Sequence, residues 1–186
     1  MQKRSLSLLL LIACCLTIAS CGPSRRSQTV QAKRLVPEIT QFVDNNDDFL
    51  QALINISKKM LEYSERTPTW DKQSNHYGIY VYNNEVDFGN YGFDPYLYED
   101  IVLITDNEKK LIADILLKSS PSQAGIVIEP NKVYFTYAQI YNTSVIIRYP
   151  SIEIADSGIY TSRVEFTEPL TDDWCIYICN FKATLF

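Results

Sequence analysis

Side chains that could act as catalytic bases, nucleophiles or metal ligands are sparse in this sequence. His76 is the single histidine among 186 residues, so a catalytic triad or a two-histidine metal site would depend on it alone. No G-x-S-x-G elbow presents a serine nucleophile, and the six glycines form neither a phosphate loop nor a dinucleotide fingerprint. The sequence therefore predicts no catalytic set, no metal site and no cofactor, and it favours binding over catalysis.

Neighbouring acidic side chains offer the main route to an enzyme. Glu99 and Asp100 form one pair, and Asp172 and Asp173 form another. Glycoside hydrolysis uses two carboxyl groups, one to donate a proton and one to act as base or nucleophile. Adjacent acids in loops are usually solvated, so a carboxylate-dependent hydrolase is the alternative interpretation and not the preferred one.

Two cysteines lie four residues apart in the segment WCIYIC, as Cys175 and Cys179. On a strand both thiols would point to one face about 13 Å apart, at about 3.3 Å per residue, whereas bridged Cα atoms lie within about 7 Å. We therefore expect two buried thiols. A disulfide would need an interrupted strand, and a zinc site would need two further ligands.

Tyrosine is unusually dense, with 13 in the chain and six between residues 77 and 98. Its rigid ring and hydroxyl suit binding surfaces, and it also favours strands. We expect the tyrosines of residues 77–82 to belong to the sheet. We predict that the glycine- and aromatic-rich loop 89–100 is the contact surface, through Tyr91, Phe93, Tyr96 and Tyr98.

The N-terminus has the pattern of a secretory signal peptide. Lys3 and Arg4 precede an apolar run from Leu6 to Ala19. This run has about 14 residues, fewer than the roughly 20 that a membrane-spanning helix needs. We therefore expect the chain to be exported and residues 1–20 to be removed.

The end of this run carries a second signal, Ile18-Ala19-Ser20-Cys21. It resembles the lipobox of bacterial lipoproteins that the lipoprotein signal peptidase processes, with Ile18 where leucine is usual. The resemblance implies cleavage before Cys21, a diacylglycerol thioether on its sulfur and often a third acyl chain on its new amino group. Two or more chains anchor a protein stably, so the implied location is the cell membrane or outer membrane, with the domain exported.

Charge limits the partners of the exported part. The mature chain keeps 15 of the 17 basic residues and all 22 acidic ones, so its formal net charge falls from −5 to −7. Such a chain is a poor match for nucleic acid, and we expect the membrane to be bound through the acyl chains on Cys21 alone. Residues 21–35, which are polar and hold four basic residues, are expected to be a flexible tether.

Residues 36–186 are expected to form one α+β domain. Apolar residues recur every three or four positions over 36–63, which predicts an amphipathic helix with a break near 45–48. A coiled-coil dimer with Asn46 in its core is the alternative. A capping box at 105–108 begins a second helix that runs to about 117. Alternating segments predict a hairpin at 77–88 and further strands at 125–129, 133–141, 144–154, 159–167 and 174–186.

The helices should pack on an antiparallel sheet of about five to seven strands, ending in a meander. The sequence thus predicts a membrane-anchored lipoprotein whose exported domain binds a protein or small ligand at the cell envelope. The hydrolase is one alternative. The other is a structural subunit of an envelope assembly, in which a partner would bury the long helix.

Overall fold

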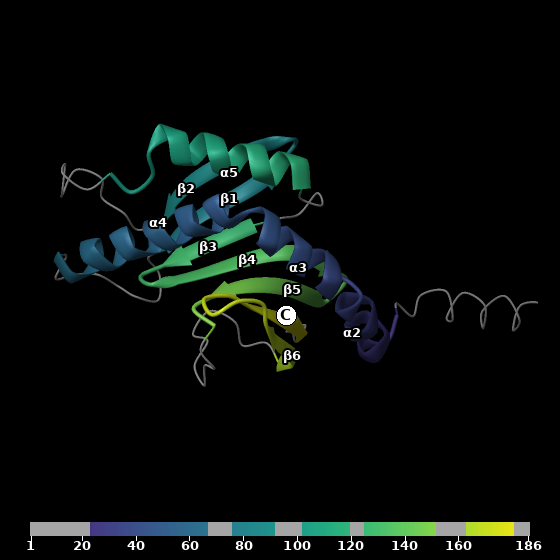
Figure 1. The fold of residues 1–186 in the computed structure, drawn as a ribbon. Helices are drawn as coiled ribbons and strands as arrows, with labels where there is room; N and C mark the ends of the chain where they lie inside the picture. Colours follow the sequence, from purple (N-terminus) through teal and green to yellow (C-terminus); the bar gives the residue numbers. More distant parts are fainter. Residues whose placement is uncertain (1–22, 67–75, 92–101, 120–124, 152–162, 181–186) are drawn as a thin grey trace, which may run out of the picture.

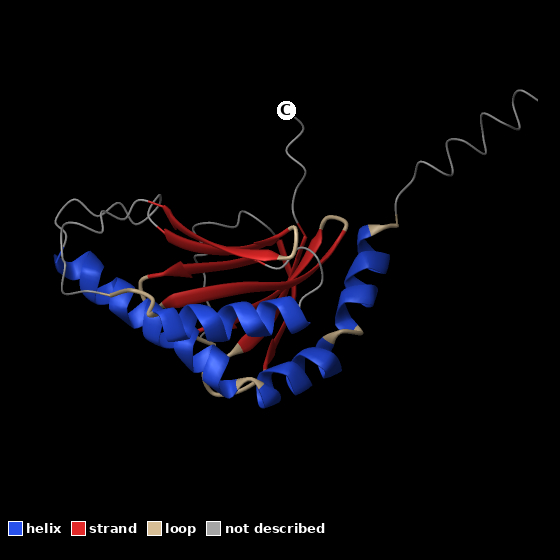
Figure 2. Cartoon of the chain, turned by 90° about the horizontal axis from the view of Figure 1, so that it is seen from above, coloured by secondary structure: helices blue, strands red, loops and turns tan. Residues whose placement is uncertain are grey.

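The computed structural model describes residues 23–66, 76–91, 102–119, 125–151 and 163–180. They form two layers, a seven-stranded sheet and a set of helices that lie on one side of it (Figures 1 and 2). The predicted α+β architecture is therefore confirmed.

The predicted break in the first helical region is confirmed at Asn46. Helix α3 spans Val36–Asn45 and helix α4 spans Asp47–Arg66. Asn46 leaves the helical conformation, with φ −129° and ψ 40°, and its side-chain amide donates to the Phe42 carbonyl at 2.7 Å. Both helices pack on the chain's own sheet, as expected, so Asn46 ends a helix instead of setting the register of a coiled coil.

The tether prediction is wrong for residues 25–33, which form helix α2 (Arg25–Lys33). Ser24 begins this helix, because its hydroxyl accepts a hydrogen bond from the Ser27 amide at 3.3 Å. Gln28 and Ala32, one turn apart, are buried where α2 contacts strands β4, β5 and β7. The N-cap of helix α2, Ser24, thus lies only three residues after Cys21 in the sequence.

The sheet is antiparallel throughout, in the order β2-β1-β3-β4-β5-β7-β6. Strand β7 lies between β5 and β6, so the last strands do not follow the predicted meander. The strands are β1 (His76–Tyr82), β2 (Glu85–Tyr91), β3 (Gly125–Glu129), β4 (Lys132–Ile140), β5 (Thr143–Tyr149), β6 (Arg163–Pro169) and β7 (Cys175–Asn180).

The β1–β2 hairpin turns at Asn83 and Asn84, whose φ angles are 50° and 62°. Asparagine tolerates this left-handed region, which a tight two-residue hairpin turn requires at both positions. The predicted hairpin is therefore confirmed, with strands that extend a few residues beyond the predicted range.

The predicted capping box is also confirmed, at the start of helix α5 (Asp106–Ser119). The Glu108 carboxylate accepts from the Thr105 amide at 2.7 Å, and the Glu108 amide donates to the Thr105 hydroxyl at 3.2 Å. The same carboxylate pairs with Lys59 of α4 at 3.1 Å. One side chain therefore caps α5 and joins it to α4.

The core lies between the helices and the sheet. An aromatic group joins α3 and α4 to β4, with Phe42 centred 5.8 Å from Phe135 and 5.4 Å from Tyr137. Alternate residues of β3, β5 and β7 complete this layer with buried isoleucine and valine. The opposite face carries a smaller buried cluster of Tyr134, Ile146 and Cys179.

Candidate functional site

The residues predicted to contact a partner fall mostly outside the described ranges. Tyr91 is the last residue of β2, where it pairs with His76 of β1. Phe93, Tyr96, Tyr98 and the predicted lipid-bearing Cys21 lie outside the residues that the structure describes. The aromatic contact surface therefore stays a prediction.

The tyrosines of β1 divide between the core and the surface. Tyr77 is buried in the helix-facing layer, and desolvation, with the charge of Asp87, raises its pKa to about 12. Tyr82 at the end of the strand is 73% exposed. The prediction that the tyrosines of residues 77–82 belong to the sheet is thus confirmed, although only some of their rings are buried.

The two cysteines of β7 are both buried free thiols, as predicted. The Cys175 thiol donates to the Arg148 carbonyl at 3.7 Å, and burial raises its pKa. A thiol that stays protonated is a poor nucleophile and a poor metal ligand. Within the described ranges, no group of three or more His, Cys, Asp or Glu side chains is placed to hold a metal ion.

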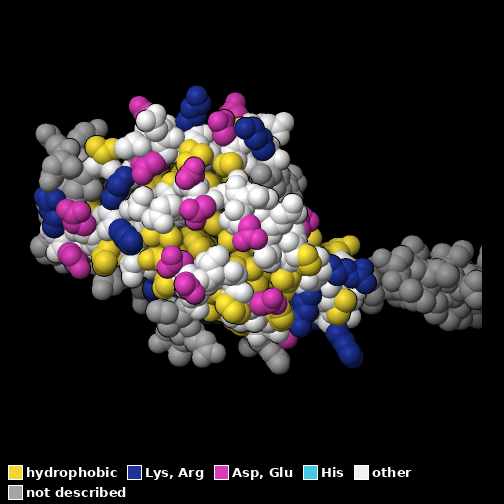
Figure 3. Space-filling model, viewed as in Figure 1, with side chains coloured by type: hydrophobic (Ala, Val, Ile, Leu, Met, Phe, Trp, Pro, Cys, Tyr) yellow, Lys and Arg dark blue, Asp and Glu magenta, His cyan; other side chains and the backbone are white. Residues whose placement is uncertain are grey.

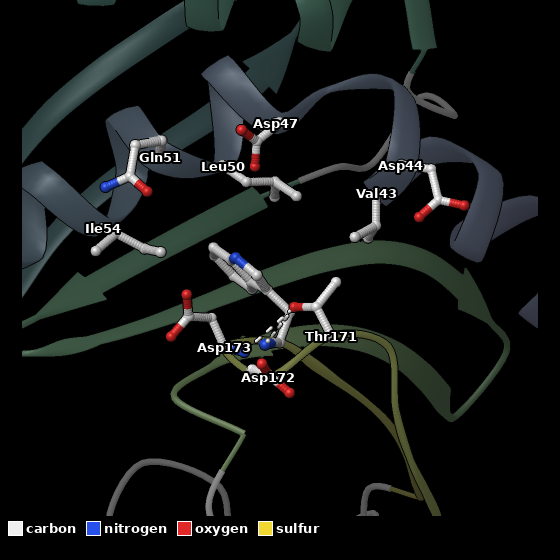
Figure 4. Close-up of a pocket in the computed structure, with 10 residues that line it drawn as sticks. Val43, Asp44, Asp47, Leu50, Gln51, Ile54, Thr171, Asp172 and Asp173 are labelled. Carbon is white, nitrogen blue, oxygen red and sulfur yellow. Dashed lines mark hydrogen bonds between the residues drawn. The ribbon is translucent and has the colours of Figure 1, made fainter.

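A pocket of about 410 Å³ lies between the helical layer and the turn that joins β6 to β7 (Figure 4). Its helical wall comes from α3 and α4, and its other wall comes from residues 171–174. Both apolar and acidic side chains line it. The lining residues are Val43, Asp44, Asp47, Leu50, Gln51, Ile54, Thr171, Asp172, Asp173 and Trp174.

Hydrogen bonds within residues 170–174 fix the lower wall of this pocket. The Thr171 hydroxyl accepts from the amides of Asp173 at 3.2 Å and Trp174 at 3.1 Å, as Figure 4 shows. The Trp174 carbonyl accepts from the Leu170 amide at 2.8 Å, which closes the turn. A threonine that bonds its own following backbone is a common turn-forming device. Asp172 and Asp173 therefore lie on a turn that these hydrogen bonds stabilise.

The helix break fixes the opposite wall. Asp44 lies in the last turn of α3, and Asp47 lies in the first turn of α4. The helix dipole favours a negative charge at the position of Asp47, because it is at the N-terminus of its helix. Because the chain changes direction at Asn46, both acids line the same pocket. Trp174 is only 3% exposed and packs against Tyr149, with ring centroids 5.6 Å apart.

The pocket's electrostatic character follows from its composition. Four of its lining residues are aspartates, and no lysine or arginine is among the described lining residues. Like charges that share a site repel one another, so a bound cation is favoured there. The pocket can accept a positively charged group above apolar surface, as a lysine side chain or an organic amine would offer.

A second polar cluster lies on the sheet face away from the helices. Arg148 is 3% exposed, and its guanidinium lies 5.4 Å from the ring centres of both Tyr134 and Tyr177. Nη1 donates to the Tyr177 hydroxyl at 3.3 Å, whereas Nε and Nη2 are buried without a hydrogen-bond partner. Such donors suit a carboxylate or phosphate, but they are shielded from solvent here. The open acidic pocket is therefore the better candidate for a ligand.

Sequence reasoning found half of this pocket. The sequence marks Asp172 and Asp173 as an adjacent acidic pair, whereas Asp47 belongs only to the predicted helix break near 45–48 and Asp44 precedes that break. The two pairs are more than 120 residues apart in the chain, and only the fold brings them together. Glu99 and Asp100 lie outside the described ranges.

No protein-family model, curated protein or solved structure matches this chain. Among the helices of the described segments, none has both the length and the apolar character needed to cross a bilayer.

Proposed function

We propose that this chain is a bacterial lipoprotein, anchored through Cys21 to the cell membrane or outer membrane, whose exported domain binds a positively charged partner. The anchor is supported by the signal-peptide pattern and the lipobox-like Ile18-Ala19-Ser20-Cys21. The partner is a small cationic ligand or a basic segment of an envelope protein.

One observation carries the binding part of this proposal. Aspartates from two distant segments line one pocket together with apolar side chains. Both walls are fixed, by the Thr171 hydrogen bonds on one side and by Asn46 on the other. Because the backbone that carries the aspartates is held in place before a ligand arrives, less ordering entropy opposes binding.

The binding test uses the full chain, purified in detergent, with trilysine amide as the probe. The chain has two tryptophans, so Trp70→Phe leaves Trp174, which lines the pocket, as the only tryptophan fluorophore. We expect a saturable change in its emission as the peptide is added. Removing two carboxylates by Asp172→Asn and Asp173→Asn should weaken binding about 2- to 30-fold, at about 0.2–1 kcal/mol for each surface charge pair.

A matched variant separates the pocket from net charge. Glu65→Gln with Asp114→Asn removes two exposed acids from α4 and α5 and changes the total charge equally. This variant should bind like the parent chain. Equal loss in both variants, or no response of Trp174 to the peptide, would reject the pocket as the binding site. If only the pocket variant loses binding, crosslinking of both variants in the native membrane would identify a protein partner.

A carboxylate-dependent hydrolase is the second candidate, because Asp172 and Asp173 line one pocket with Asp44 and Asp47. It makes a different prediction from simple binding. Single replacements by asparagine would abolish turnover of a glycan substrate while leaving trilysine affinity nearly unchanged. A structural subunit, in contrast, would show self-association or poor solubility of the unlipidated chain.

A further inference from the structure

Helix α2, the first described helix, gathers basic side chains at one end of the domain. Arg25, Arg26 and Lys33 belong to the helix, and Arg34 follows it. All four are exposed, and the helix itself contains no acidic residue. Figure 3 shows the dark blue side chains together at this end. Although the chain as a whole is acidic, this surface is positive.

The helix is held on the sheet through a buried glutamine, and the four basic side chains remain exposed. On its inner side, Gln28 Oε1 lies 3.0 Å from the Thr143 hydroxyl, which also contacts Asn180. Gln28 Nε2 donates to the Pro23 carbonyl at 2.7 Å, which extends the attachment toward the start of the helix. The basic side chains therefore belong to a fixed surface and not to a mobile tether.

A shallow groove of about 370 Å³ runs along this surface. Arg25, Arg26 and Lys33 line it, together with Val30, which is 48% exposed. Glu165 is the acidic residue among its described lining residues. None of the ion pairs between described residues uses the basic side chains of α2, although the Lys33 ammonium lies 4.3 Å from the centre of the Phe166 ring. Basic side chains close to an anionic membrane surface are attracted to its headgroups.

The position of the surface relative to Cys21 suits this use. Arg25 is four residues beyond Cys21, and an extended chain covers at most about 3.6 Å per residue, or roughly 14 Å. A lipid on Cys21 would therefore keep the start of α2 within about two Debye lengths of the headgroups, at about 8 Å for each Debye length.

We propose that the surface formed by Arg25, Arg26, Val30, Lys33 and Arg34 docks on anionic lipid headgroups and orients the domain against the bilayer. This inference rests on the proposed lipid anchor, because the anchor keeps the surface at the membrane. It differs from attachment through acyl chains alone, which would leave the domain free to tumble at the end of a tether.

The test measures the orientation of the full, lipidated chain in vesicles. A fluorophore is attached at Gln31→Cys, an exposed position of α2, and in a second preparation at Asp114→Cys on α5. Doxyl-labelled lipids quench fluorophores that approach the membrane. The vesicles contain phosphatidylcholine alone or phosphatidylcholine with phosphatidylglycerol.

Docking predicts strong quenching at position 31 in anionic vesicles and weak quenching in neutral ones, with little at position 114 in either. Each basic residue near an anionic surface strengthens attachment roughly fivefold, so Arg25→Gln with Arg26→Gln should lower the ratio of docked to undocked domains about 25-fold. Lys58→Gln with Lys110→Gln removes the same charge from exposed positions of α4 and α5 and should have no effect.

Failure of the docking and failure of the anchor give different results. A chain that floats with the vesicles and carries acyl mass on Cys21, but whose quenching at position 31 is equal in neutral and anionic vesicles, overturns the docking and leaves the anchor standing. Equal quenching in the two charge variants also overturns it. A chain with an unmodified Cys21 overturns both proposals.

Discussion

The attachment of helix α2 to the sheet can be tested by truncating one buried glutamine, Gln28→Ala. Gln28 is 5% exposed and makes two hydrogen bonds, to Pro23 and to Thr143, the latter itself fully buried. The only other buried residue of the helix is Ala32. The attachment of α2 therefore depends on few contacts, and the loss of these two hydrogen bonds should weaken it strongly.

The size of the effect follows from those contacts. A hydrogen bond contributes about 0.5–1.5 kcal/mol net to stability, so the loss of two costs about 1–3 kcal/mol. At about 1.4 kcal/mol for each factor of ten, the detached state of α2 should become roughly 5 to 150 times more populated. Gln31→Ala changes an exposed glutamine of the same helix and should have little effect.

Limited proteolysis reads the detached state directly, because trypsin cuts after Arg25, Arg26, Lys33 and Arg34. When the helix opens and closes faster than it is cut, the cleavage rate follows the population of the open form. Cleavage at these sites, identified by product mass, should thus be about 5 to 150 times faster in Gln28→Ala than in Gln31→Ala. Equal rates in the two variants would show that the buried network does not hold α2.

Two further outcomes are expected. Glu108 is partly desolvated, which raises its pKa, but the hydrogen bonds from Thr105 and Lys59 outweigh this and hold the pKa below its usual value of 4.5. Its contribution to the free energy of unfolding is therefore present above about pH 4.5 and is lost as the pH falls through the lowered pKa. In urea denaturation, the parent chain should have a higher free energy of unfolding than Glu108→Gln near neutral pH. This difference should become smaller in acid. Cys175 and Cys179, as buried free thiols, should resist alkylation in the folded chain and react fully in urea without reductant; a mass deficit of two hydrogens would instead indicate a disulfide.

Local signals predicted most of the secondary structure. The Asn45–Asp48 run marked the break between α3 and α4, and Thr105 with Glu108 marked the start of α5. Alternation of apolar residues located the strands. These signals work because caps, turns and pleats depend on residues that are neighbours in the chain.

Features that depend on distant contacts were missed. Helix α2 has no apolar stripe, because its buried side chains are a glutamine and an alanine, so its sequence resembles a linker. Its attachment depends on Thr143 of a distant strand, which contacts Gln28 and also hydrogen-bonds Asn180 of the neighbouring strand. The place of β7 between β5 and β6 could not be predicted from local sequence either. Short connections between strands predict that consecutive strands pair with each other, whereas here β5 pairs with β7. The four-aspartate pocket needs the same long-range information.

The proposed anchor is tested most directly by the mass of the N-terminal peptide of the mature chain, purified from bacterial membranes beside a Cys21→Ala variant. The proposal predicts that the peptide begins at Cys21 and carries the mass of a diacylglycerol group, with or without a third acyl chain, and that the variant keeps its signal segment. A mature N-terminus at another residue, or an unmodified Cys21, would contradict both the anchor and the docking of α2 that rests on it.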